Sequence, residues 1–90
     1  MMYPYVTLAD GTEVVHSHLM GEEDNPEVKV HFERPAKYGF DSVTYLLPYY
    51  KQLERLGDFT DDEITRLKDF TTRNAHLFYR FAAEGGHGIA

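Results

Sequence analysis

Three histidines are the side chains in this sequence best suited to bind a metal ion. His16 and His18 stand two positions apart, and His31 lies further along the chain. Alternate residues of a strand share one face, so two paired strands would bring these imidazoles together, and imidazole nitrogens bind zinc at about 2.1 Å. The sequence has no cysteine and no His-Glu-x-x-His pattern. A solvated, mildly polar face that binds no metal is therefore the other interpretation.

Seven tyrosines form a second group with the potential to bind a partner. Tyrosine offers a large rigid ring with a polar tip, and contact surfaces between proteins are enriched in it. The same rings would also serve to fill the core of a small domain. The candidates for a contact surface are the following tyrosines and histidines: Tyr3, Tyr5, His16, His18, His31 and Tyr38.

Asn74 is a polar residue on an otherwise apolar helical stripe, between Phe70 and Phe78. A buried amide that lacks hydrogen-bond partners costs roughly 1 to 3 kcal/mol. We therefore predict that Asn74 is buried and bonds to a strand edge or to the following helical turn. Fixing the register of a homodimer and holding a ligand are the alternatives.

Four predicted strands position these residues. Residues 3–8, 13–20, 27–33 and 40–47 either alternate apolar and polar side chains or are rich in β-branched and aromatic residues, as strands are. The pair Asp10-Gly11 predicts a two-residue hairpin turn between the first two strands.

A symmetric loop between the second and third strands would fix the register of the histidines. His16 would then lie opposite His31, and His18 opposite Lys29. The first turn would place Tyr5 opposite His16, so that a row of Tyr5, His16 and His31 crosses the outer face of the sheet. A slip of one residue turns every side chain of a strand to the other face, so the whole row depends on this loop.

A short helix is predicted after the strands, over residues 48–56. Pro48 is favoured in the first turn of a helix, and Tyr49, Leu53 and Leu56 recur at helical spacing.

A long helix is predicted over residues 61–84. Thr60 and Glu63 form a capping box before it, and an apolar stripe runs along its length. The predicted fold class is therefore α+β: an antiparallel meander of three to four strands covered on one face by the two helices. We expect one domain over residues 1–90, with 85–90 a flexible tail.

Composition narrows the function classes. The chain has 90 residues, 42% hydrophobic and 27% charged, with a formal net charge of −6 and no run of basic residues. Nucleic acid is not an expected partner, because no basic stripe is available to contact phosphates. The lack of cysteine favours a reducing cytoplasm, and no apolar run approaches the roughly 20 residues of a membrane span.

The predicted function is a noncatalytic protein-interaction or regulatory module, acting on a protein partner or by self-association. No catalytic residue is predicted, because no nucleophile stands beside a base with an orienting partner. One alternative is a domain that binds a metal, zinc for example, or a small ligand through His16, His18 and His31. Another is an antitoxin-like protein that occludes a basic partner.

Several short strings are typical of one group of proteins: Tyr3-Pro4-Tyr5, Thr7-Leu8-Ala9-Asp10, Val30-His31-Phe32-Glu33-Arg34-Pro35, Gly39-Phe40-Asp41-Ser42 and Asn74-Ala75-His76-Leu77. Together they resemble a group of short uncharacterised bacterial proteins over nearly the whole chain. The chain is also similar to small α+β domains encoded beside toxin–antitoxin genes, with strands ahead of a terminal helix. Neither group supplies a catalytic residue, so the resemblance implies an accessory or regulatory cytoplasmic protein.

Overall fold

A long antiparallel hairpin of two strands, β4 (Asn25–Ala36) and β5 (Gly39–Leu47), forms the centre of the fold. The computed structural model describes residues 1–86. The sheet runs in the order β1-β2-β4-β5-β6, with β3 paired to the start of β4, and every pairing is antiparallel. The remaining elements are β1 (Met2–Thr7), β2 (Glu13–Ser17), β3 (Met20–Glu22), β6 (Lys51–Leu56) and the helix α1 (Asp61–Ala83).

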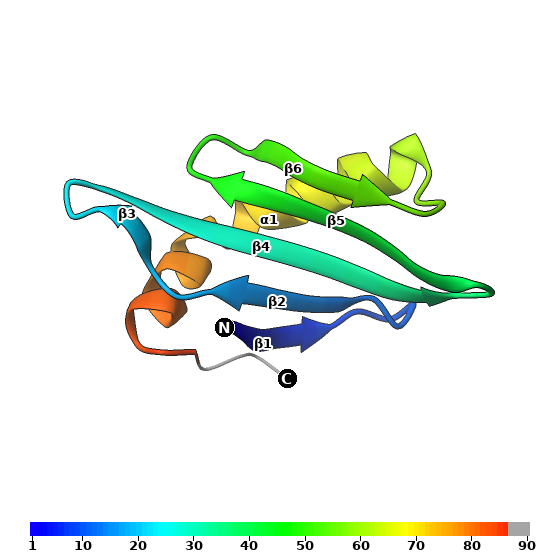
Figure 1. Ribbon diagram of the computed structural model, residues 1–90, viewed down its shortest axis with the longest axis horizontal. Helices are drawn as coiled ribbons and strands as arrows, with labels where there is room; N and C mark the ends of the chain where they lie inside the picture. Colours follow the sequence, from blue (N-terminus) through cyan, green and yellow to red (C-terminus); the bar gives the residue numbers. More distant parts are fainter. Residues whose placement is uncertain (87–90) are drawn as a thin grey trace.

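Helix α1 covers one face of the sheet and leaves the other uncovered (Figure 1). Figure 1 looks onto the uncovered face, with α1 behind the strands. The helix packs on β2, β4 and β5. The predicted α+β class and antiparallel meander are confirmed, and the helix predicted over 61–84 is α1.

The beginning of α1 is fixed by the predicted capping box. The Thr60 hydroxyl accepts a hydrogen bond from the Glu63 N–H at 3.1 Å, and the Glu63 carboxylate accepts one from the Thr60 N–H at 2.9 Å. At the other end, the Gly86 N–H donates to the Phe81 carbonyl at 2.6 Å. The rest of the expected tail, residues 87–90, lies outside the described residues.

Alternation along β4 and β5 builds the core. On β4, Val28, Val30 and Phe32 have no exposed surface. Their cross-strand partners on β5 are equally buried, since directly opposed residues of an antiparallel pair share a face. Those partners are Leu47, Tyr45 and Val43.

The predicted helix over 48–56 is wrong, because Lys51–Leu56 form strand β6 against β5. The chain reverses just before it, where the Leu47–Pro48 peptide bond is cis and Tyr50 has a φ of 54°. The β5–β6 register shifts at Leu53, the extra residue of a bulge. A bulge breaks strict alternation, and pairing with the open edge of β5 outweighs local propensity.

The strand predicted over 13–20 is two strands, and the predicted register of the histidines is wrong. The β3–β4 pairs follow the expected symmetric loop, with Met20 opposite Glu27. The strand is then interrupted at His18 and Leu19. The pairing of β2 with β4 is shifted by one residue, so that His16 lies opposite Val30. A one-residue shift turns the side chains of β2 to the other face.

Arg34, near the end of β4, joins three parts of the chain. Its guanidinium pairs with Asp41 of β5 at 2.8 Å, with Asp10 of the first turn at 3.6 Å, and with Glu63 of α1. It also lies 4.5 Å from the centre of the Phe59 ring. Bidentate and stacked contacts of this kind are a particular property of arginine.

This junction sets the pKa values of its carboxyl groups. The Arg34 guanidinium, and after it the Thr60 N–H, lower the pKa of Glu63 to about 2. The pKa of Asp41 is lowered first by the N–H of Asp58 and then by Arg34. A lowered carboxyl pKa stabilises the fold above the ordinary value of about 4.5, and this contribution is lost as pH falls towards about 2.

We expect the Glu63→Gln variant to melt a few degrees below the wild type at pH 7, and the difference to vanish near pH 2. Glutamine keeps the capping box but cannot pair as a charge with Arg34. Thermal melts followed by circular dichroism between pH 7 and pH 2 check this. A difference that stays constant over that range would contradict the assigned role of the Glu63 charge.

Candidate functional site: the bare face of the sheet

The face of the sheet turned away from α1 is the candidate functional surface, and it is called the bare face here. Because Val28, Val30 and Phe32 point to α1, the alternate residues Lys29, His31 and Glu33 point the other way. Cross-strand pairing extends this face over the sheet. Its residues on the neighbouring strands include Glu13 and Val15 of β2, Ser42, Thr44 and Leu46 of β5, and Lys51, Glu54 and Leu56 of β6.

A shallow hollow of about 400 Å³ lies near the middle of the bare face. His31 lies at its centre, with Nδ1 2.7 Å from the Thr44 hydroxyl and Nε2 3.5 Å from a carboxylate oxygen of Glu33. The hollow therefore combines an oriented imidazole with apolar walls. Its lining residues are Met2, Lys29, His31, Thr44, Leu53 and Glu54.

Large apolar side chains of the bare face are open to solvent, and two of them, Met2 and Leu53, line the hollow. Met2 is 39% exposed, Leu53 42%, Leu56 57% and Phe40 59%. Single exposed apolar residues are ordinary on protein surfaces, but several on one face mark a contact surface. The bare face is thus the part of the described chain where exposed apolar and charged side chains are interleaved.

The three histidines proposed for a metal are not brought together. His16 has no exposed surface and lies on the face towards α1, its ring centre 6.0 Å from that of Phe78. His18 is exposed at the break between β2 and β3, and His31 is on the bare face. Within residues 1–86 no group of three histidine, aspartate or glutamate side chains is arranged to hold a metal ion.

The tyrosine candidates are divided between the core and the surface. Tyr5 is fully buried, because it is the extra residue of a bulge in β1 and turns towards the helix. Tyr3 pairs with His16 on the same side of the sheet. Tyr38 is 90% exposed at the turn between β4 and β5, beside Lys37. The predicted pairing of Tyr5 with His16 is therefore wrong, and neither residue is available to a partner.

Asn74 is half-buried, and its partners are neither a strand edge nor the following helical turn: they are a side chain of the sheet and the preceding turn of α1. Its amide oxygen accepts a hydrogen bond from the Tyr5 hydroxyl at 2.7 Å, and its amide nitrogen donates to the Phe70 carbonyl at 2.9 Å. The pair joins β1 to α1 across the core.

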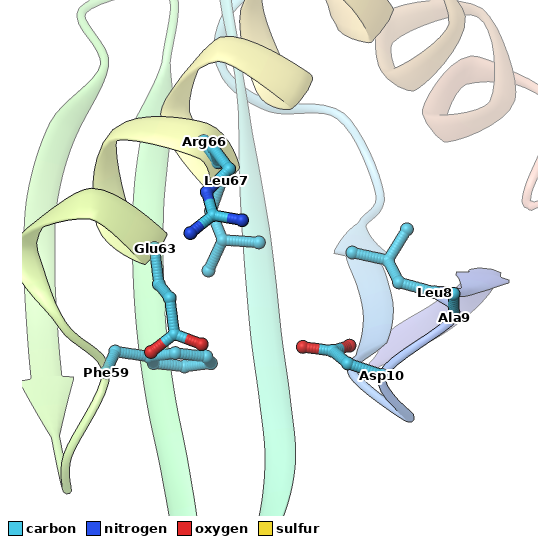
Figure 2. A pocket seen from close by; sticks show the side chains of 7 residues that line it. All are labelled: Leu8, Ala9, Asp10, Phe59, Glu63, Arg66 and Leu67. Atoms are coloured by element: carbon cyan, nitrogen blue, oxygen red, sulfur yellow. The ribbon is translucent and has the colours of Figure 1, made fainter.

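A second cleft, of about 280 Å³, opens beside the Arg34 junction. Figure 2 shows the carboxylates of Asp10 and Glu63 pointing towards one another from opposite walls, with the Phe59 ring beneath Glu63. Both carboxylates already pair with Arg34, so their charges are compensated within the fold. The cleft is lined by Leu8, Ala9, Asp10, Phe59, Glu63, Arg66 and Leu67.

Sequence reasoning missed both Arg34 as a junction and the residues that flank His31. Alternation of Lys29, His31 and Glu33 in the sequence does indicate one shared face. Thr44 and Leu53 come from strands whose register no local pattern fixes. No local pattern indicates the role of Arg34, because two of its acidic partners, Asp10 and Glu63, are remote in sequence.

Comparisons with models of protein families, with curated proteins and with solved structures find no match. Among the described residues, no helix is both long enough and apolar enough to cross a membrane.

We expect Tyr5→Phe to destabilise the protein by about 1 kcal/mol, because Asn74 loses its hydroxyl donor in the core. Tyr45→Phe is the matched control, since the Tyr45 hydroxyl is buried without a hydrogen-bond partner among residues 1–86. Its removal should leave the free energy of unfolding unchanged or raise it. Urea denaturation of both variants checks this, and equal losses would show that the Tyr5–Asn74 bond adds nothing specific.

Proposed function

We propose that this chain is a noncatalytic protein-interaction module that docks a protein partner on the bare face. One observation carries the proposal: α1 covers one side of the sheet, while the other side exposes Met2, Phe40, Leu53 and Leu56 and has a shallow hollow lined by two of them, Met2 and Leu53. Burial of apolar area of this kind drives association between proteins.

The interleaved charges of the bare face fit a specific contact. Lys29, Glu33, Lys51 and Glu54 lie between the apolar side chains. Mixed apolar and charged surfaces are typical of interfaces that form and dissociate, and the charges select the partner. A regulatory domain needs such a surface, and it needs no reaction centre of its own.

The edges of the sheet are poorly suited to docking by strand addition. Edge strand β1 contains Pro4 and has a bulge at Tyr5. The other edge strand, β6, has its bulge at Leu53 and presents Lys51 and Arg55. Prolines, bulges and charges are the features that keep edge strands from pairing with other chains, so the face supports the proposal better than the edges do.

Photo-crosslinking in the native host tests where partners bind. We expect a photoreactive amino acid at Phe40 or Leu56 on the bare face to form covalent adducts with protein. The same photoreactive amino acid at Asp62 or Lys68, which are exposed on α1, should form few adducts. All four positions are solvent-exposed, so exposure alone cannot produce the difference.

Adducts from the helix positions at the same yield, or no adducts from the face, would refute the proposed docking surface. The mass of each adduct also shows whether the partner is another copy of the 10.4 kDa chain.

A further inference from the structure

We propose that the partner of the bare face is a second copy of this chain, packed face to face about a two-fold axis that runs across the strands along the row of His31 and Thr44. This inference rests on the proposed function and adds the identity of the partner and the symmetry of the contact.

The charges of the bare face are separated into rows. Three rows of side chains cross the sheet, and neighbouring rows are two residues apart along each strand, or about 7 Å. The lysine row is Lys29, Leu46 and Lys51; the central row is Val15, His31, Thr44 and Glu54; the glutamate row is Glu13, Glu33, Ser42 and Leu56. Positive charge therefore lies on one side of His31 and negative charge on the other.

Two symmetric arrangements of the face are possible in a sandwich with aligned strands. An axis parallel to the strands would set lysine row against lysine row and glutamate row against glutamate row. An axis across the strands reverses the strand direction, so the lysine row of each copy faces the glutamate row of the other. The second arrangement sets Lys29 of each copy against Glu33 of the other, and its like-charged contact is Glu54 of the central row with its own copy. Like charges in contact oppose association and opposite charges favour it, so two Lys29–Glu33 contacts favour the second arrangement over one in which whole rows of like charge meet.

Lys29 and Glu33 are the pair that this axis brings together, because both lie on β4 at equal distances from His31. Among residues 1–86, Lys29 makes no ion pair, and neither does Lys51. Glu33 has a 41% exposed side chain, and its carboxylate lies 3.5 Å from Nε2 of His31. The charges that would meet across the interface are thus available in the single chain.

The turns at the two ends of β4 follow the same rule. One turn holds Glu22, Glu23 and Asp24, and the other holds Lys37. The axis across the strands brings the acidic turn of each copy towards the basic turn of the other. The same axis therefore brings opposite charges together both at the rows and at the turns.

The size of the bare face is sufficient for a stable dimer. Viewed onto this face, as in Figure 1, the molecule measures 40 × 25 Å. The outline of the whole molecule in this view encloses on the order of 1,000 Å², and a stable interface buries roughly 800 Å² on each partner. Sheets that pack face to face keep their strands within about 30° of alignment, which this axis permits.

Reversing charges one at a time tests both the partner and the axis. We expect the wild type to sediment as a dimer, with twice the 10.4 kDa mass of the chain. Lys29→Glu alone and Glu33→Lys alone should each weaken the dimer about tenfold or more, because each places two like-charged pairs in the interface. An equimolar mixture of these two variants should form a heterodimer as stable as the wild type, since both contacts between positions 29 and 33 are again of opposite sign.

Lys68→Glu, on the exposed side of α1, is the matched control and should leave the dimer unchanged. Circular dichroism melts of each variant confirm that it is folded. A wild type that stays monomeric at its highest soluble concentration overturns the inference. So does a dimer that Lys29→Glu tightens, which would indicate the axis parallel to the strands, and so does a mixture that fails to recover.

The two proposals fail in different ways. If the wild type is monomeric and its bare face still crosslinks to another protein, the proposed self-association is refuted and the proposed docking surface stands. A monomer whose face forms no adducts removes both.

Discussion

Alternation along β4 decides which surface this molecule offers to others. Val28, Val30 and Phe32 are buried against α1 and the neighbouring strands, and burial of each such side chain stabilises the fold by roughly 1.5 to 3 kcal/mol. The residues between them, Lys29, His31 and Glu33, are forced to the bare face by the geometry of an extended chain. The docking surface is therefore not an addition to the fold. The same alternation that makes the core makes the surface.

The interruption between β2 and β3, at His18 and Leu19, shows how a register shift of one residue changes which side chains lie on each face of the sheet. At the end of β2, just before this interruption, the Ser17 hydroxyl accepts a hydrogen bond from the backbone N–H of Lys29 at 2.9 Å. The shift places Val14 and His16 towards α1, and it places Val15 on the bare face. His16 is thereby buried among aromatic rings, with Nδ1 2.8 Å from the Ser17 carbonyl. A metal site formed by His16 and His31 would require both side chains to lie on the same face of the sheet.

The parts of the fold that sequence predicts well are those fixed by local signals. The capping box of Thr60 and Glu63 defines the start of α1, and the alternation of residues 27–33 defines the core strand β4. The strand register was predictable only for the β3–β4 pairs, which follow directly from the tight turn between these two strands. The bulges at Tyr5 and Leu53 depend on contacts with distant elements, so no local pattern announces them. For the same reason the bare face was only partly predictable: His31 was placed on it, while Thr44 and Leu53 were not.

Net charge bears on whether such a chain can associate with itself. A formal charge of −6 repels two copies at long range, and salt screens this repulsion beyond about 10 Å. Contact between the copies is governed by the charges that lie at the interface. In the lysine and glutamate rows these nearly balance, with Lys29 and Lys51 on one side and Glu13 and Glu33 on the other. Much of the excess negative charge lies at the start of α1, away from the bare face, and the acidic β3–β4 turn lies towards Lys37 of the other copy. Separation of charge on the bare face thus allows an acidic chain to recognise its own copy in one orientation, because that orientation sets Lys29 of each copy against Glu33 of the other.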